Sequence, residues 1–249
     1  MPPESGQHST SLRNNPPPAL VVALDLPTAS AALTLAESLR SLPLWLKVGL
    51  ELFTASGPDL LKSLRSTRLP LFLDLKFHDI PNTVRGAVRS AITTGARMAT
   101  LHLCGGEAMC RAAVSARNET KEHRADNAED GLLLMGVTVL TSQAGREEDI
   151  RSLVVERALA AKAWGLDGVV CSGWEAAAVK AACGPEFLCL CPGIRFEGPA
   201  AAGRDDQARI CTPKQAAAAG ADFLVMGRPI TGAAHPAEAA QAALDSMRR

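Results

Sequence analysis

Apolar and polar positions alternate along this sequence in a repeating order. Short aliphatic runs, each about one strand long, are followed by a polar or glycine turn and then by an Ala/Leu-rich stretch with helical spacing. The aliphatic runs predict eight strands, at residues 19–26, 45–50, 71–77, 98–103, 132–140, 168–172, 187–194 and 223–227. The amphipathic stretches predict helices at residues 28–41, 58–66, 83–93, 147–164, 174–182, 213–219 and 236–247.

This order of elements predicts an α/β protein with a closed (β/α)8 TIM barrel. Helices between most pairs of strands imply parallel strands, and eight such units in about 230 residues suit a closed barrel. A doubly wound open sheet is the competing fold, but no G-x-G-x-x-G follows the first strand. One helix start is explicit, because Thr212 can cap a helix whose first residue is Pro213.

Two segments differ in composition from the predicted barrel. Residues 1–18 are rich in Pro, Ser and Asn and predict a disordered leader, which leaves residues 19–249 as a single catalytic barrel domain. Residues 117–130, "RNETKEHRADNAED", are highly charged, and we interpret them as a solvated excursion.

The charge balance and the cysteines narrow the class of partner. Lys+Arg and Asp+Glu number 26 each, so no global field attracts nucleic acid or an anionic membrane, and no apolar run is long enough to cross a bilayer. Small molecules are therefore the favoured partners. The seven cysteines contain no C-x-x-C pair and lie mostly in or beside apolar runs. We interpret them as reduced, small apolar residues, which indicates a cytoplasmic location.

Polar residues gather where the predicted strands end. The third strand, within "LFLDLKFHDIPNTV" (71–84), places Asp74 and Lys76 on one face and is followed at once by Asp79. Other polar or glycine positions within or just after strands are Asp25, Lys47, Thr141, Arg195, Gly227 and Arg228. Barrel enzymes carry their sites at the carboxyl ends of the strands, and the loops after strands seven and eight commonly bind phosphate. We therefore expect one shared site, with Arg228 beside a phosphate.

Six stretches in register carry a resemblance to a known family. They are "ALD" (23–25), "KVGLELF" (47–53), "DLKFHDIPNT" (74–83), "GLDGVVCS" (165–172), "PGIR" (192–195) and "MGRPI" (226–230). Together they resemble the orotidine 5'-phosphate decarboxylase family, from about residue 19 to the C-terminus. The resemblance implies decarboxylation of orotidine 5'-monophosphate (OMP) to UMP and CO2 in de novo pyrimidine biosynthesis, by a homodimer that uses neither a metal nor an organic cofactor.

The resemblance also assigns a role to each matched residue. Lys47, Asp74, Lys76 and Asp79 match the family's alternating catalytic array, in which the last aspartate reaches into the neighbouring subunit's site. Thr83 matches a hydroxyl that assists Asp79 across the dimer interface. The remaining substrate-binding matches are Asp25 for a ribose hydroxyl, Thr141 for the pyrimidine, and Arg195, Gln207, Gly227 and Arg228 for the phosphate, and Lys47 belongs to this set as well.

The chemistry of the reaction agrees with this array. Loss of CO2 from C6 of OMP leaves electron density on an sp2 carbon without an ordinary electron sink, so a fixed cation is needed, and Lys76 is our candidate. The same ammonium can then protonate C6. Asp74 would repel the substrate carboxylate, and that repulsion is relieved as CO2 departs. The stretch after Arg195, residues 196–207, is the expected lid over the phosphate.

Several alternatives remain open at this point. Asp25 could cap the following helix, Arg195 could be a surface cation and Thr141 could be a turn residue. Two other function classes also fit a barrel. One is a sugar-phosphate lyase or synthase that binds Mg2+ through further acidic residues, which "HDIPNT" and Lys47 disfavour. The other is a barrel that binds a nucleotide without catalysis.

Overall fold

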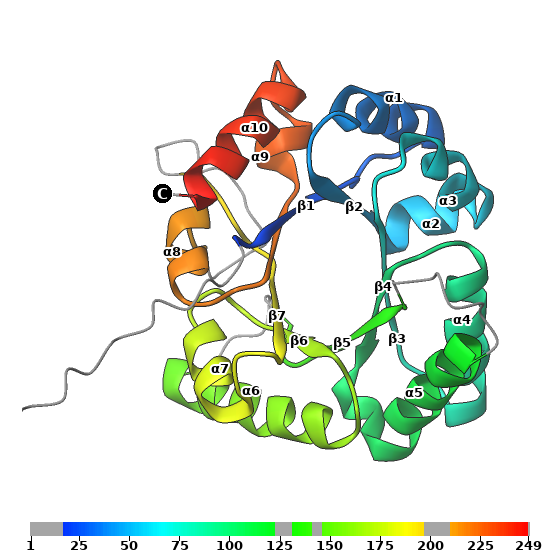
Figure 1. The fold of residues 1–249 in the computed structure, drawn as a ribbon, viewed down its shortest axis with the longest axis vertical. Coiled ribbons are helices and arrows are strands. Elements are labelled where there is room, and N and C mark those ends of the chain that lie inside the picture. The colour runs from blue at the N-terminus through cyan, green and yellow to red at the C-terminus, as the bar shows by residue number, and fades with distance from the viewer. Residues whose placement is uncertain (1–16, 123–130, 141–145, 197–209, 249) are drawn as a thin grey trace, which may run out of the picture.

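Eight parallel strands close into a barrel with helices around it (Figure 1). The computed structural model describes residues 17–122, 131–140, 146–196 and 210–248. The strands pair in chain order, and β8 pairs in parallel with β1 to close the ring. The predicted (β/α)8 TIM barrel is therefore confirmed. The predicted leader, residues 1–18, lies outside the described residues except for Pro17 and Pro18.

All eight predicted strands are present, most of them shorter than predicted. They are β1 (Ala19–Ala23), β2 (Leu44–Gly49), β3 (Leu71–Phe77), β4 (Met98–His102), β5 (Leu133–Val137), β6 (Gly168–Val170), β7 (Leu188–Cys191) and β8 (Phe223–Met226). The difference lies mainly at the carboxyl ends, where the chain leaves the ladder before the apolar run ends. Asp25 and Arg195 consequently lie in loops just past β1 and β7.

Helices follow the strands around the outside of the barrel. They are α1 (Ala29–Leu39), α2 (Leu50–Ser56), α3 (Asp59–Leu64), η1 (Arg65–Thr67), α4 (Pro81–Thr93), η2 (Leu103–Gly105), α5 (Gly106–Glu122), α6 (Glu147–Ala163), α7 (Ala176–Cys183), α8 (Pro213–Ala218), α9 (Arg228–Thr231) and α10 (Pro236–Met247). The predicted start of α8 is confirmed, since Thr212 accepts from the backbone N–H of Gln215 and Pro213 is the first helical residue.

The interpretation of residues 117–130 as a solvated excursion is wrong for their first part. Helix α5 continues to Glu122, and the side chain of Arg117 is only 8% exposed. Its guanidinium lies 2.5 Å from Asp167 Oδ2, which also accepts a hydrogen bond from the Leu134 N–H. Arg117 follows the buried Cys110 and Ala113 at helical spacing, so periodicity rather than charge decides its position. Residues 123–130 lie outside the described part.

Two apolar cores result from the two faces of each strand. One fills the space between strands and helices, and the other fills the inside of the barrel. The buried members of the inner core are Val21, Ala23, Phe72, Met98, Met135, Leu190, Phe223 and Val225. Because side chains alternate along a strand, the residues two positions after Phe72 and Met98, which are Asp74 and Thr100, also point inward. The inner core therefore supports a polar layer at the carboxyl ends of the strands.

The seven cysteines all lie in the described part of the chain, as free thiols. Only Cys104 is exposed, and the other six are buried. Burial raises the pKa of the Cys110 thiol to about 12, helped by the nearby Cys104. The burial of six of the seven confirms the prediction that the cysteines mostly pack as small apolar side chains. Across the described ranges no helix is both long and apolar enough to span a bilayer.

Candidate active site

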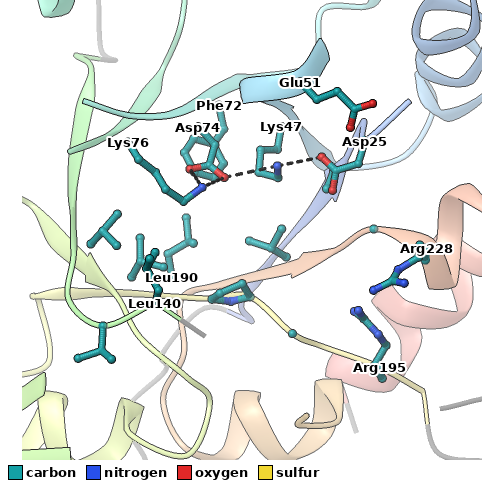
Figure 2. A pocket seen from close by; sticks show the side chains of 18 residues that line it. Asp25, Lys47, Glu51, Phe72, Asp74, Lys76, Leu140, Leu190, Arg195 and Arg228 are labelled. Carbon is teal, nitrogen blue, oxygen red and sulfur yellow. Dashed lines mark hydrogen bonds and ion pairs between the residues drawn. The ribbon is translucent and has the colours of Figure 1, made fainter. Parts of the chain in front are cut away.

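A cavity of about 490 Å3 opens at the carboxyl ends of the strands, where the barrel fold predicts a site (Figure 2). Its apolar lining comes mainly from the tops of the inner strands and the loops after them: Ala23, Phe72, Val137, Val139, Leu140, Val170, Leu190 and Val225. Its charged lining consists of Asp25, Lys47, Glu51, Asp74, Lys76, Arg195 and Arg228. The volume suits a ligand of nucleotide size.

Four of these charged residues form a continuous chain of ion pairs (Figure 2). Lys47 Nζ lies 3.1 Å from Asp25 Oδ1 and 3.4 Å from Asp74 Oδ2. Lys76 Nζ lies 3.0 Å from Asp74 Oδ1 and 3.1 Å from Asp74 Oδ2. The structure therefore brings Lys47, Asp74 and Lys76 together as predicted, with Asp25 added at one end.

Asp74 is the more enclosed of the two carboxylates in this row of ion pairs, with 13% of its side chain exposed against 56% for Asp25. Burial alone raises the pKa of a carboxyl group, but the charges of Lys47 and Lys76 and hydrogen bonds from Lys76 and Thr100 outweigh it here. The net result is a pKa of Asp74 below its ordinary value. Asp74 is thus held as an anion between two ammonium groups, which compensate for its desolvation.

Asp25 lines the cavity and does not cap the following helix. The cap of α1 is Thr28, whose side chain accepts from the Ala31 N–H at 3.3 Å. Asp25 instead binds Lys47, and its side chain is 56% exposed and lines the cavity. The helix-cap alternative for Asp25 is therefore wrong, and its carboxylate is free to accept hydrogen bonds from a ligand hydroxyl.

Two arginines form a second charged region of the cavity. Figure 2 shows the guanidinium groups of Arg195 and Arg228 turned toward each other, at a place in the cavity apart from Lys47, Asp74 and Lys76. Arg195 follows β7, where its N–H donates to the Cys211 carbonyl and Ile194 bridges to Cys211. Arg228 opens α9 directly after Gly227, which also lines the cavity. Two convergent guanidinium groups are suited to a phosphate dianion.

Asp79 and Thr83 lie outside this cavity. Asp79 is exposed just after β3, where its Oδ1 accepts from the Ile80 N–H at 2.6 Å, and Thr83 is exposed in the first turn of α4. Ile80 between them is 67% exposed. Within one chain, Asp79 therefore does not line the cavity together with Lys47, Asp74 and Lys76. Thr141, Gln207 and all of the expected lid except Phe196 lie outside the described residues.

Three residues near the array have no counterpart among the predicted site residues. Glu51 lines the cavity, and Gly49 adjoins the Lys47 ammonium. Thr100 is buried and hydrogen-bonds both to the Asp74 carboxylate and to the backbone of Lys76. Gly49 and Glu51 fall within the matched stretch "KVGLELF", so the family resemblance could have indicated them as site residues. Thr100 lies in none of the matched stretches.

Comparison with known proteins identifies relatives over most of the chain. The model of the "Orotidine 5'-phosphate decarboxylase / HUMPS family" matches residues 18–243. An orotidine 5'-phosphate decarboxylase of Nitratidesulfovibrio vulgaris (strain DSM 19637 / Miyazaki F) is 53% identical, over 92% of this chain and 98% of the relative. One of Nostoc sp. is 45% identical, over 87% and 92% respectively.

Solved structures agree with these sequence relatives. The crystal structure of orotidine 5'-phosphate decarboxylase from Lactobacillus acidophilus matches with a TM-score of 0.77 and 32% sequence identity. That match covers 94% of this chain and 100% of the other. The similarity therefore extends over the whole barrel and includes each strand that carries a site residue.

Proposed function

The chain belongs to the orotidine 5'-phosphate decarboxylase / HUMPS family, and from this membership and the site we propose that it converts OMP to UMP and CO2. This is a carboxy-lyase reaction of pyrimidine biosynthesis. The observation that carries the proposal is the pairing of the Lys76 ammonium with the Asp74 carboxylate, 3.0 Å apart, at the inner wall of the cavity. Both residues lie in the cavity that would receive the substrate.

Lys76 supplies the positive charge that the reaction needs. Loss of CO2 from C6 of the pyrimidine leaves an electron pair in an sp2 orbital that the ring cannot delocalise. A fixed ammonium beside that carbon stabilises the developing charge without reorganising at the moment of reaction. Lys76 Nζ is held by both oxygens of Asp74, and 39% of its side chain is exposed. It then donates the proton that completes UMP.

Asp74 has two roles in this scheme. It orients both lysines, since Oδ2 faces Lys47 and Oδ1 faces Lys76. It would also lie beside the carboxylate of bound OMP, so that the carboxylate of the protein and the carboxylate of the substrate repel each other. Departure of neutral CO2 removes that repulsion, and this contributes to lowering the barrier. Lys47 keeps Asp74 ionised throughout and also touches the ribose end through Asp25.

Other residues would contact the remaining parts of the substrate, which are the ribose, the pyrimidine and the phosphate. Asp25 accepts from a ribose hydroxyl, and Arg195 and Arg228 hold the phosphate beside Gly227. For Thr141 and Gln207, which lie outside the described residues, the family match alone supports contacts with the pyrimidine and the phosphate, respectively. Binding energy from the phosphate, remote from C6, is then available to align the base against the array.

A homodimer completes the active site in this proposal. Asp79 and Thr83 are exposed in the single chain, next to the exposed Ile80. Leu50, at the start of α2 and three residues after the cavity-lining Lys47, is 63% exposed as well. Exposed apolar side chains beside a charged site are what a subunit interface would cover. Asp79 of each subunit would then reach the partner's Lys76. A cytoplasmic location belongs to the same proposal.

A spectrophotometric assay of the purified chain with OMP tests the proposal directly. We expect the absorbance of the orotate ring to change as UMP and CO2 form, at a rate that EDTA does not alter. Activity that EDTA abolishes and Mg2+ restores would indicate the metal-dependent sugar-phosphate class instead. Binding of UMP without any CO2 release from OMP would indicate a binding protein.

A further inference from the structure

The β3–β4 pairing breaks at the residues that carry the array. Leu73 pairs with Ala99, but the next pair is Phe77 with Leu101. Three residues of β3, 74–76, therefore lie opposite the single residue Thr100. Such a bulge re-aims side chains and leaves backbone groups outside the regular ladder. Both Asp74 and Lys76, the first and last residues of this break, line the cavity.

Lys76 adopts an unusual backbone conformation within this bulge. Its φ is +51°, in the left-handed region that residues with a side chain rarely occupy. Its N–H donates to the hydroxyl of Thr100 at 2.9 Å, in place of a backbone carbonyl of β4. A strained conformation persists only where the surrounding structure holds it. The Thr100 hydroxyl is the group that holds the Lys76 backbone on the β4 side.

The same hydroxyl also fixes the carboxylate of Asp74. Thr100 Oγ1 donates its single proton to Asp74 Oδ1 at 2.9 Å. Oδ1 also accepts from Lys76 Nζ, whereas Oδ2 faces Lys47. Thr100 is 1% exposed and is absent from the lining of the cavity. Its hydroxyl therefore ties the backbone of one array residue to the side chain of another without contacting the space for the substrate.

We propose that Thr100 is a positioning residue of the reaction, whose hydroxyl holds Asp74 and the Lys76 backbone in the arrangement that places the ammonium at C6. This inference rests on the proposed function and deepens it. Thr100 acts through Asp74 and Lys76 and touches no substrate atom. Its loss should therefore lower kcat and leave the affinity for UMP nearly unchanged, because binding of UMP needs no aligned proton donor.

The principal variant is Thr100→Val, which keeps the shape of the side chain and removes the hydroxyl. We expect kcat with OMP to fall about 10- to 100-fold, with KM and the Kd for UMP changed by less than about twofold. Without the Thr100 hydrogen bond the pKa of Asp74 rises, so the acid limb of the kcat profile should move to higher pH. Thr100→Ser, which retains the hydroxyl, should restore both kcat and the limb.

Thr67→Val is the matched control. Thr67 is also buried, and its hydroxyl likewise accepts from a backbone N–H, that of Leu69, and donates to an oxygen, the Leu64 carbonyl. It precedes β3, at the barrel end opposite the cavity. Removal of a purely structural hydroxyl should lower the midpoint temperature of unfolding and leave kcat and the acid limb of its pH profile unchanged. Thr67→Val is expected to behave in that way.

The outcomes separate this inference from the proposed function. An active wild type whose Thr100→Val variant keeps its kcat and its acid limb would overturn the positioning role alone. A wild type that releases no CO2 from OMP would overturn the positioning role and the proposed function together. Should the valine variant be recovered only as aggregate, Thr100→Cys replaces it, because a thiol is small but a weak hydrogen-bonding group. Full kcat in the cysteine variant would likewise count against the role.

Discussion

The ammonium nitrogen of Lys47 lies in space that only a glycine at position 49 leaves open. A β-carbon at Gly49 would stand 2.9 Å from Lys47 Nζ and 3.2 Å from Asp25 Oδ1. Gly49 has φ −90° and ψ 178°, which any residue adopts, so the backbone does not require a glycine there. The requirement is steric, and it comes from the charged end of the Lys47 side chain.

We therefore expect Gly49→Ala to fold and to lose activity. The added methyl group displaces a flexible lysine tip, which costs the fold little, but it moves the cation that keeps Asp74 ionised. The expected loss in kcat/KM is about 2 kcal/mol, roughly 30-fold. Steady-state kinetics and circular dichroism measure the two effects. Gly86→Ala in α4 is the control, since its β-carbon would meet nothing within 4 Å, and it should keep wild-type kinetics.

Arg228→Ala should lower kcat/KM, with a loss of about 2–4 kcal/mol in transition-state stabilisation. The reason is that it removes one of two guanidinium groups at the phosphate end of the cavity. The same substitution should have little effect on turnover of orotidine, which lacks the phosphate. Comparing both substrates in both proteins isolates the contact. Arg40→Ala removes an exposed arginine far from the cavity and should change neither rate. An equal loss with orotidine would contradict the phosphate contact.

Mixing two inactive variants tests whether the subunits share their sites. Lys76→Ala and Asp79→Ala should each lose most activity as homodimers. If Asp79 serves the partner's Lys76, a mixed dimer contains one site with both substitutions and one with neither. Subunit exchange should then recover activity, up to one wild-type site per mixed dimer. No recovery after exchange, with mixed dimers verified by native mass spectrometry, would place Asp79 outside the partner's site.

Asp74 should make stability depend on pH in the acid range. The pKa of its carboxyl is lower in the folded chain than its ordinary value of 3.8, so the unfolded chain binds more protons between those two values. The stabilisation is complete above the unfolded pKa and is lost as the pH falls through the folded one.

Urea unfolding at fixed protein concentration, for wild type and Asp74→Asn, measures this effect. We expect the difference in free energy of unfolding to be constant above about pH 5 and to shrink as the solution becomes more acidic. Asp59→Asn is the control, because Asp59 pairs with Lys62 on the surface, where solvent screens the interaction. Its difference should be small at every pH. A pH-independent difference for Asp74→Asn would contradict a lowered pKa.

The barrel and the meeting of Lys47 with Asp74 inside it are predictable from the sequence for one physical reason. A period of two places Asp74 in phase with the buried Phe72, and Lys47 in phase with Trp45, so the charges must point into the barrel. The carboxyl ends of parallel strands then bring them together. Charge content misled the interpretation of Arg117, where helical spacing decides burial.

Thr100 marks the limit of what a pattern can reveal. Threonine is an ordinary strand residue, and nothing near residue 100 indicates a site. Its role depends on a break in register between two strands and on the left-handed backbone of Lys76. Both are properties of the assembled barrel, because the break in register exists only between the two paired strands β3 and β4. Residues of this kind are found only once the neighbouring strand is in place.

Turnover of OMP by Lys76→Ala under saturating substrate tests the central claim most directly. If the Lys76 ammonium stabilises the charge at C6 and delivers the proton, kcat should fall by at least about 10⁴-fold, while the affinity for UMP changes far less. Circular dichroism should confirm an intact barrel. A variant that retains more than about a tenth of the wild-type kcat would contradict the account, because the cation at C6 would then come from elsewhere.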